Sequence, residues 1–573
     1  MIKMEQIIKD TIKIDALKNA VKFNGKCNPK ALIGAVIKDF PEVKDNMQEL
    51  MKDINFIAKE INEMTLENQK SELLALDSRA LDKKPKQEKK DLFRELNNVD
   101  KEKGVVMRFA PSPSGPMHIG HAFSGIPTSI YVKRYGGKFI LRIEDTNPDN
   151  IYVPAYELLP KDAEWIFGNV TDIWIQSDRI KTYYNYAKKF INANAAYVCD
   201  CDNEEFKELI KNKKPCPCRS LSKEENLKRW KKMIDPSGYK QGEVVLRFKA
   251  DINHKNPALR DFPLARINET EHPRQGKKYR VWPLMNLSVT ADDIEARMTH
   301  IIRSKHHQTN AERQKLMYTS LGIKEIPESM FLGNWHFEGM EISCSKTKIK
   351  IEEGKLNGWD DIRGPFLMAL RRRGFQAEAL VSFTKQVGIT PNDKKMDVKE
   401  FFKALDAYNK EIIDPISKRF FFIPNPIKIN IKNAPSQKIE LDLHPDNIKG
   451  GRVFDVNENF LLDKKDVDKF SNTLIRLMDC FNFKKEKDGY VFDSLDYEVF
   501  KEQKGRNIIH WLADNEKVVD TEILMPDNSI IKGKAEEGIL KLKIGDIIQF
   551  ERFGFCRLDS IDKNIYKFWF THK

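Results

Sequence analysis

The sequence predicts a multidomain protein in which an α/β domain follows a helical N-terminal part and precedes a β-rich C-terminal part. Three patterns along its 573 residues support this: apolar residues at helical spacing near the start, short apolar runs beside helical segments from Gly104, and strict alternation from Pro424. At ~150 residues per domain, the length corresponds to about four domains. With 40% apolar residues the chain can build packed cores, which excludes a disordered or peptide-like protein.

Residues 1–82 are expected to form a helical extension. Spacings of four and seven residues place Leu50, Ile54 and Ile61 on one stripe of a helix. Residues 83–103 contain 13 charged residues out of 21, which predicts a solvated helix or linker that cannot build a core.

The central α/β domain is expected in two halves, residues 104–198 and 281–340. Between them the pattern breaks into stretches rich in cysteine, proline and charge, so residues 199–280 are expected to be an insertion. The strand-like apolar runs of the two halves are Val105–Phe109, Phe139–Ile143, Trp282–Val289 and His300–Arg303.

The rest of the chain divides into a mainly helical, basic segment at 341–423 and a β-rich region at 424–573. The helical segment contains the basic run Arg371–Arg373. Period-2 alternation between turn residues predicts barrels in the last region. The alternating runs are Ile427–Ile431, Ile439–Leu443 and Ile547–Leu558.

The composition predicts a soluble cytoplasmic protein with a surplus of basic residues. The 98 Lys and Arg exceed the 85 Asp and Glu by 13, which favours a polyanionic partner such as nucleic acid, although a generally basic surface would give the same count. No run approaches the ~18 apolar residues of a membrane span, and the N-terminus lacks the apolar core of a secretory signal. No membrane partner is therefore expected.

The most informative segment is RFAPSPSGPMHIGH, Arg108–His121. A strand ending at Phe109 is followed by a proline-rich loop and then by a segment that can continue as a helix. This places His118 and His121 at the N-terminal turn, where unpaired backbone N–H groups and the helix dipole favour phosphate. The two histidines are three residues apart and share a face, and Gly120 lets a flat ligand approach the backbone.

This segment resembles the H-I-G-H signature of class I aminoacyl-tRNA synthetases, and together with FILRIEDTNP at 139–148 it resembles the glutamyl-tRNA synthetase version. The resemblance to archaeal-type members extends over nearly the whole chain. It implies a Rossmann-like catalytic domain with an acceptor-end-binding insertion, an N-terminal helical extension and C-terminal β-barrel anticodon-binding domains.

A second segment, Glu341–Lys346 (EISCSK), resembles the lysine-containing K-M-S-K-S loop of this class but departs from it at Glu341 and Cys344, where lysines commonly stand. The resemblance implies activation of L-glutamate by ATP with Mg²⁺, and transfer of the glutamyl group to the 3′ end of tRNA(Glu). Charge stabilisation by His118, His121 and Lys346 would then be catalytic. The residues expected at ATP are Pro111, Pro113, His118, Gly120, His121, Ser343, Ser345 and Lys346.

Glutamate offers two carboxylates and an ammonium, so its pocket requires cations and an acid. Arg108 and Arg303 match substrate-contacting arginines of the family. Ser112 and Glu144 also fall on matching positions, and Glu144 is expected at the ammonium. Met285 stands where many relatives carry tyrosine, which puts one substrate hydrogen bond in doubt.

Four of the eight cysteines form two close pairs in the expected insertion, Cys199-x-Cys201 and Cys216-x-Cys218. Soft thiolates in such pairs suit a tetrahedral structural Zn²⁺. The alternative is four free thiols in a loop, since C-x-C is less diagnostic than C-x₂-C.

Two other functions stay open at this point. Glutaminyl-tRNA synthetases share the architecture, but their signature usually reads P-P-E-P-N-G before the H-I-G-H element, whereas APSPSG at Ala110–Gly115 favours glutamate. A catalytically silent RNA-binding relative would explain the departures at Glu341, Cys344 and Met285. A monomer is expected, and tRNA(Gln) stays open as a second substrate.

Overall fold

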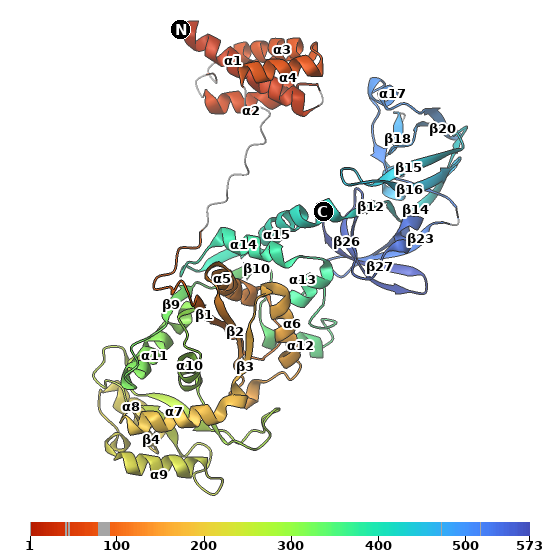
Figure 1. The fold of residues 1–573 in the computed structure, drawn as a ribbon. Coiled ribbons are helices and arrows are strands. Elements are labelled where there is room, and N and C mark those ends of the chain that lie inside the picture. Colours follow the sequence, from red (N-terminus) through yellow and green to blue (C-terminus); the bar gives the residue numbers. More distant parts are fainter. Residues whose placement is uncertain are drawn as a thin grey trace. The chain divides into compact units, whose positions relative to one another are not determined.

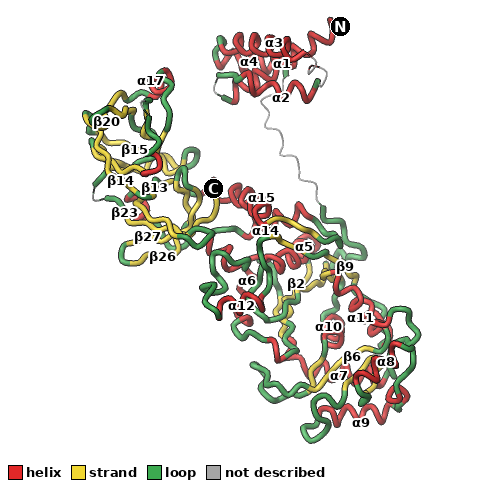
Figure 2. The backbone as a smooth tube through the Cα atoms, turned by 180° about the vertical axis from the view of Figure 1, so that it is seen from behind, coloured by secondary structure: helices red, strands yellow, loops and turns green. Residues whose placement is uncertain are grey.

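The computed structural model describes residues 2–23, 25–40, 43, 46–77, 92–471, 473–515 and 517–573. The chain divides into two compact units, Met1–Lys90 and Asp91–Lys573. The first unit is helical, and the second contains the sheets (Figure 1 and Figure 2).

The first unit has four helices among its described residues: α1 Ile2–Lys22, α2 Pro29–Asp39, α3 Met47–Asn62 and α4 Leu66–Leu76. Leu50, Ile54 and Ile61 of α3 are buried, so the helix and the stripe that the spacing predicts are confirmed. Gln69 of α4 is fully buried, and its amide donates to the carbonyl oxygens of Ile61 (2.8 Å) and Gly25 (2.9 Å). These bonds connect α4 to the end of α3 and to the turn after α1.

The centre of the second unit is a parallel sheet. Strands β1 Val105–Phe109, β2 Gly137–Ile143 and β3 Asp172–Ile175 pair in the order β1-β2-β3, and β8 His300–Ser304 pairs with β9 Glu328–Leu332. Thr299, just before β8, donates its backbone N–H to the carbonyl of Val106 at 3.0 Å, so the β8–β9 pair lies beside β1. Helices α5 Ile119–Tyr135 and α6 Ala155–Phe167 connect the first three strands. This alternation confirms the predicted Rossmann-like domain.

The core of this sheet includes part of the expected linker. Residues 83–91 of that segment lie outside the described residues. Phe93 and Leu96, however, are 3% and 9% exposed and belong to the same buried cluster as Val105 and Phe139. The expectation that residues 83–103 contribute no core is therefore wrong for the second half, because two apolar side chains among the charges are enough to anchor it.

Between β3 and β8 the chain forms an antiparallel sheet of β4 Ala196–Cys199, β5 Val245–Phe248, β6 Phe262–Ile267 and β7 Val281–Pro283. The helices of this region are α7 Ile180–Asn192, α8 Asn203–Lys211, α9 Lys223–Ile234 and α10 Met285–Glu295, and α11 Gln308–Ser320 follows β8. The strand predicted at Trp282–Val289 is thus wrong beyond Pro283. Because α10 is buried on all sides from Asn286 to Asp293, its apolar residues Leu287, Val289 and Ala291 alternate with polar ones as in a strand and do not follow a helical stripe.

After β9, strand β10 Trp335–Glu338 pairs with β11 Lys394–Asp397, and the helices are α12 Cys344–Glu352, α13 Leu367–Arg373, α14 Ala377–Val387 and α15 Val398–Ile413. The basic run at the end of α13 is largely engaged within the protein. Arg373 is buried and donates to the carbonyl of Thr571 at 3.1 Å, while Arg372 pairs with Asp559 at 2.7 Å. Of the three arginines, Arg371 is the exposed one.

The C-terminal residues form two seven-stranded sheets, in the orders β12-β25-β26-β27-β23-β24-β13 and β21-β18-β19-β20-β14-β17-β22, and a hairpin of β15 and β16. The strands are β12 Lys418–Phe420, β13 Phe422–Pro424, β14 Pro426–Lys432, β15 Gln437–His444, β16 Ile448–Val456, β17 Asn459–Asp463, β18 Ile475–Leu477, β19 Asn482–Glu486, β20 Gly489–Ser494, β21 Ile508–Ile509, β22 Leu512–Ala513, β23 Val519–Leu524, β24 Ile530–Ala535, β25 Ile547–Phe550, β26 Gly554–Asp562 and β27 Ile565–His572. Short helices α16 Lys464–Val467 and α17 Tyr497–Glu502 complete this region. The predicted barrel-like, β-rich region is confirmed.

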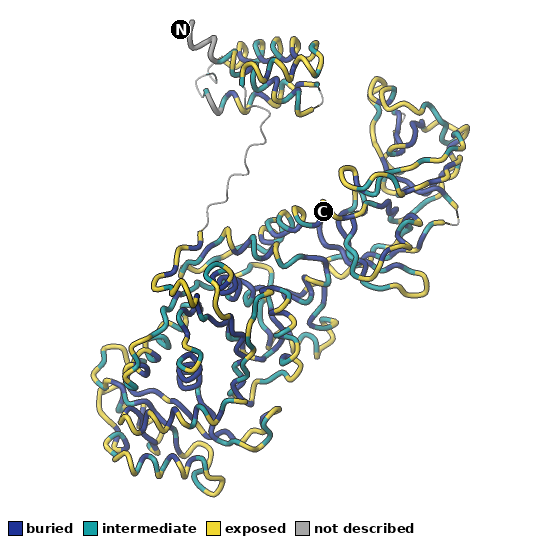
Figure 3. The backbone as a smooth tube through the Cα atoms, viewed as in Figure 1, coloured by how far each residue is buried: buried dark blue, intermediate teal, exposed yellow. Residues whose placement is uncertain are grey.

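Buried residues run along β1, β2, β4 and β8, whereas strands such as β3 and β20 are mostly half-buried (Figure 3). The two C-terminal sheets have separate cores, one around Phe460 and Trp511 and the other around Phe550 and Phe568. Within the described residues, no helix combines the length and the apolarity needed to cross a membrane.

Candidate active site

The proline-rich loop after β1 is fixed by its own carbonyl groups. The Pro111 oxygen accepts the backbone N–H of Glu144 at 3.0 Å, and the Pro113 oxygen accepts that of Tyr152 at 2.8 Å. Proline fixes φ and has no N–H of its own to satisfy. The loop is therefore held in one path at the carboxyl ends of β1 and β2, the edge at which ligands of such sheets bind.

The end of the loop is fixed from α6 and α13. A carboxylate oxygen of Asp162 accepts the backbone N–H of Met117 at 2.9 Å, and burial raises the pKa of Asp162 to about 6. The chain also pairs with the segment before α13, since Ile119 donates to the Pro365 carbonyl and Leu367 donates to the Met117 carbonyl. The start of α5 is thus anchored on both sides.

His118 and His121 lie at the start of α5, as the sequence predicts. His118 is the N-cap residue; its Nδ1 accepts the N–H of His121 at 3.3 Å, and the Nδ1 of His121 accepts the N–H of His118 at 3.3 Å. The rings stack with centroids 3.8 Å apart. Burial lowers the pKa of His121 to about 4 and that of His118 well below its usual value. Both rings are therefore neutral at pH 7, and each carries its proton on Nε2, which leaves two N–H donors for a ligand.

A cavity of about 730 Å³ opens beside this turn. It brings together six residues singled out in the sequence: Arg108, Pro111, Ser112, His121, Glu144 and Arg303. It is also lined by residues that the sequence did not single out as site residues: Ser124, Thr146, Gln176, Arg266 and His307. Met285, the expected departure, lies on the same wall.

The buried arginines in and beside this cavity differ in whether a carboxylate pairs with them. Arg142, fully buried below the floor, pairs with Asp293 at 2.6 Å and with Glu144 at 3.0 Å. Burial lowers the pKa of Arg142, but these two carboxylates outweigh burial and raise it above its ordinary value. Arg303 instead donates to the neutral amide of Gln314 at 2.9 Å.

Arg108 and Arg303 are each only 6% exposed, and among the described residues the Nε of each has no hydrogen-bond partner. Burial and the charge of Arg142 lower the pKa of Arg108 to about 9, and burial also lowers that of Arg303. Two buried guanidinium groups with unused donors make the cavity suited to an anion such as a carboxylate.

The lysine-containing second segment lies against the first. Cys344 is 7% exposed and packs on Gly115, where a Cβ would stand 3.0 Å from the Cys344 sulfur. Ser343 caps α12 by accepting the N–H of Lys346 at 3.4 Å. The Lys346 ammonium is exposed and pairs with Glu341 at 2.6 Å, which raises the pKa of the lysine.

The remaining predicted residues lie outside the cavity lining. Pro113 lies in the loop beside it, and Ser343, Ser345 and Lys346 are on α12 or its cap. Gly120 belongs to the first segment and faces the second: a Cβ at this position would meet the His118 ring at 3.1 Å and Ile342 at 3.8 Å. The structure therefore brings the two segments into contact but keeps the lysine outside the cavity.

The cavity residues missed in the sequence come from separate elements, from α5 to the turn after β8, so no local pattern linked them. Two of them carried a signal, since Thr146 and His307 lie three and four residues after the predicted strands Phe139–Ile143 and His300–Arg303, and residues after strand ends line the ligand edge of a parallel sheet.

The four cysteine sulfurs of the insertion converge. All four lie within 4.8 Å of one another, with 3.9 Å between Cys199 and Cys216 and 3.6 Å between Cys201 and Cys218. Zinc–sulfur bonds of about 2.3 Å in a tetrahedron place sulfurs roughly 3.8 Å apart. The geometry of the donor set therefore fits a Zn²⁺ ion.

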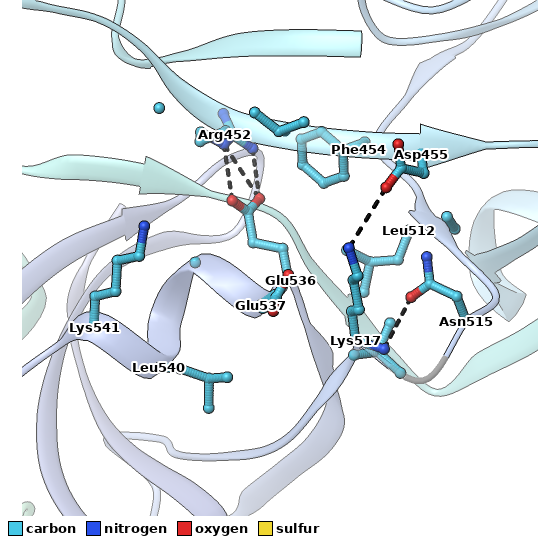
Figure 4. Close-up of a pocket in the computed structure, with 15 residues that line it drawn as sticks. Arg452, Phe454, Asp455, Leu512, Asn515, Lys517, Glu536, Glu537, Leu540 and Lys541 are labelled. Atoms are coloured by element: carbon cyan, nitrogen blue, oxygen red, sulfur yellow. Dashed lines mark hydrogen bonds and ion pairs between the residues drawn. The ribbon is translucent and has the colours of Figure 1, made fainter. Parts of the chain in front are cut away.

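A second cavity, of about 320 Å³, lies between the C-terminal sheets (Figure 4). Arg452 of β16 donates to Glu536 at 2.7 Å and to Glu551 at 2.6 Å. Burial lowers the pKa of this guanidinium, but the two carboxylates outweigh burial and raise it above its ordinary value. This buried arginine is therefore fully engaged by the protein.

Comparison with known proteins agrees with this geometry. The family model described as the catalytic domain of class I tRNA synthetases (E and Q) matches residues 104–415, and two models of their anticodon-binding domain match 417–497 and 508–559. Together with the capped histidine turn on a Rossmann-like sheet, these matches define a class I aminoacyl-tRNA synthetase.

Relatives that match over the full length of the chain show which family within this class it belongs to. A glutamate–tRNA ligase of Methanocaldococcus jannaschii is 42% identical over 568 residues, 97% of this chain and 99% of the relative. One of Methanococcus maripaludis is 42% identical over 575 residues, 99% and 100% of the two chains. The chain belongs to the glutamyl-tRNA synthetase family, in its archaeal-type branch.

Among solved structures, a glutamate tRNA ligase from Elizabethkingia meningosepticum in complex with its amino acid is similar, at 19% identity and a TM-score of 0.39. The match covers 55% of this chain and 70% of that one, and it is too distant to inform the site geometry.

Proposed function

We propose that this chain activates L-glutamate with ATP and transfers the glutamyl group to the 3′ end of tRNA(Glu). The observation that carries the proposal is the cavity in which two buried guanidinium groups, Arg108 and Arg303, have unused donors beside the neutral histidine turn. The guanidinium groups suit the carboxylates of glutamate, and the turn suits the phosphates of ATP.

The first step is attack of the glutamate α-carboxylate oxygen on the α-phosphorus of ATP. This forms glutamyl-adenylate and breaks the bond to the β-phosphate, which releases pyrophosphate. His118 and His121 donate their Nε2–H groups to phosphate oxygens as charge builds up there. Mg²⁺, expected with ATP, neutralises phosphate oxygens when bound.

In the second step a ribose hydroxyl of the terminal tRNA adenosine attacks the activated carbonyl, and AMP leaves. Neither step needs a nucleophile from the protein, because positioning and charge stabilisation suffice. Lys346 must leave Glu341 to reach the phosphates, so the second segment has to shift during activation.

Glutamate recognition follows from the charges in the cavity. Arg108 and Arg303 hold the carboxylate that their buried donors attract. Glu144, whose Oε1 is held by Arg142, offers its other oxygen to the substrate ammonium. Ser112, exposed in the cavity wall, supplies a hydroxyl at the same site.

The test is tRNA-dependent ATP–pyrophosphate exchange with glutamate and with glutamine. Exchange specific for glutamate is expected. Exchange specific for glutamine would assign the chain to the glutaminyl enzyme, and no exchange by folded protein would make it a silent relative. His121→Ala and Lys346→Ala should each reduce activation by at least ~100-fold, the scale of losing a transition-state charge contact. A loss below threefold for both would contradict the site.

For the cysteine cluster we infer a structural Zn²⁺ held by Cys199, Cys201, Cys216 and Cys218. Metal analysis of the purified protein should find about one equivalent of zinc, and less than about half an equivalent would contradict the site. Cys218→Ser should lower the zinc content, whereas Cys480→Ser, at a buried thiol of the C-terminal region, should not.

The partner and the cellular setting complete the proposal. The two anticodon-binding domains support tRNA as the macromolecular partner, in a monomeric cytoplasmic enzyme. Charging assays with tRNA(Glu) and tRNA(Gln) transcripts test whether the enzyme acts on one or on both, and sedimentation of the purified chain tests the monomer.

A further inference from the structure

His307 lies in the wall of the proposed glutamate cavity, which Arg108 and Arg303 also line. It ends the turn Lys305–His307 after β8 and precedes α11. Its ring is partly buried and lines the same cavity as Arg108 and Arg303. The question is which nitrogen of the ring carries the proton, because that decides whether the ring donates to a ligand or accepts from it.

The side-chain amide of Asn310 lies beside the His307 ring, and its orientation is fixed by Arg313. Arg313 donates from Nη1 to Oδ1 of Asn310 at 3.3 Å, and Asn286 donates its Nδ2 to the same oxygen at 3.3 Å. A guanidinium can only donate, so the atom facing Arg313 must be the amide oxygen. The amide NH₂ of Asn310 then faces the other way, toward the ring of His307, with Nδ2 3.3 Å from Nδ1.

Arg313 itself has a fixed position. Its Nε donates to the carbonyl of Ala258 at 2.7 Å, and its guanidinium lies over the ring of Phe262 at 5.1 Å. The amide orientation therefore rests on contacts with the insertion and not on the ring it orients.

Because the Asn310 NH₂ is a donor, Nδ1 of His307 accepts, and the proton of the neutral ring lies on Nε2. Burial and the charges of Arg303 and Arg108 lower the pKa of His307, so the ring is neutral at pH 7. Among the described residues, Nε2 has no recorded hydrogen-bond partner.

We propose that His307 is a third glutamate-recognition residue, whose Nε2–H donates to the substrate carboxylate that Arg108 and Arg303 hold. Asn310 and Arg313 act through it as positioning residues. A carboxylate accepts about four hydrogen bonds, so two guanidinium groups and one ring N–H can bind together. The inference rests on the proposed glutamate activation.

The first test replaces the ring and measures exchange kinetics. His307→Leu should raise the KM for glutamate at least ~10-fold, the scale of a hydrogen bond to a charged group, and leave the KM for ATP within about twofold. His307→Gln, whose amide nitrogen can take the place of Nε2–H, should restore the glutamate KM to within about threefold. His306→Leu, at the exposed neighbouring histidine, is the matched control and should change neither constant.

The second test moves the ring proton of His307 from Nε2 to Nδ1. In Asn310→Asp the carboxylate accepts from Nδ1–H, so the ring above its pKa presents a bare Nε2 to the substrate. The glutamate KM of this variant should rise with pH between 6 and 9, while that of the wild type stays flat. The charged or titratable groups around the ring are Arg303, Arg108, His306 and, through Asn310, Arg313.

Each outcome decides between the two proposals. If wild-type protein shows no glutamate-dependent exchange, the proposed function fails. If the wild type is active, the inference about His307 fails alone when His307→Leu leaves the glutamate KM within twofold or raises both KM values equally. It also fails alone when His307→Gln does not restore the glutamate KM.

Discussion

The buried arginines of the candidate active-site cavity and the buried arginine between the C-terminal sheets differ in whether carboxylates neutralise their charge. Arg452 has two carboxylates within 2.7 Å, and its pKa is raised. Arg108 and Arg303 are also buried, but the Nε of each has no hydrogen-bond partner among the described residues, and their pKa values are lowered.

The difference shows what a buried charge does in each region. A buried charge that the protein itself neutralises holds segments together, and removing its partner is costly. A buried charge left without a partner costs stability in the free protein, and a ligand of opposite charge recovers that cost on binding. In the proposed function, buried arginine therefore stabilises the structure in one region and binds the substrate in the other.

The largest effect is expected at Arg452. Arg452→Met leaves Glu536 buried without its cation, so the free energy of unfolding of the C-terminal region should fall by about 3–5 kcal/mol. Chemical denaturation followed by fluorescence of the C-terminal tryptophans measures it. Lys567→Met, which removes an exposed pair with Asp562, is the control and should produce no measurable change. An equally small change at Arg452 would remove the contrast between the regions.

Arg303→Leu should show the reverse pattern. The kcat/KM for glutamate should fall at least ~100-fold, because a charged partner of the carboxylate is lost. The melting temperature should stay equal or rise, since the removed charge is buried and has only the neutral amide of Gln314 as its hydrogen-bond partner. A clear loss of folded stability would mean that Arg303 is structural, like Arg452.

Asp162 extends the comparison to a buried acid. Its pKa is raised to about 6, so it stabilises the fold below pH ~4, and this contribution is lost as the pH rises through 6. Asp162→Asn should therefore be more stable than the wild type at pH 8, by up to about 3 kcal/mol, and similar to it at pH 4. Melting curves at the two pH values measure the difference; equal curves at both would mean that the carboxyl is not penalised by burial.

The smallest effect is expected at the exposed pair of Glu341 and Lys346. Glu341→Gln frees the ammonium and should raise the rate of pyrophosphate exchange, but by less than about fivefold, because exposed ion pairs are weak. Lys395→Gln, which removes another exposed pair with Glu338, is the control. A decrease in rate would mean that Glu341 takes part in catalysis.

The lining of the candidate cavity was predictable from the sequence to the extent that its residues lie in contiguous motifs. Arg108, Ser112 and His121 belong to one segment, and Glu144 follows the next strand, so a motif locates them. His307, Gln176 and Arg266 come from distant elements and carry no shared pattern. Two predictions were wrong because the local pattern did not show which residues are buried. Phe93 and Leu96 are buried although they lie in a charged stretch, and α10 has no exposed face, so its apolar residues form no helical stripe.

By itself the sequence determined the family, the order of the domains, the histidine turn and the four cysteines, because these depend on residues adjacent in the chain. Only the tertiary structure decided which buried arginines lack a carboxylate partner, that Arg373 is enclosed, and how the Asn310 amide lies beside His307. Those properties depend on partners more than ten residues away or on the orientation of an amide, and electrostatic pairing at close range is set by the fold.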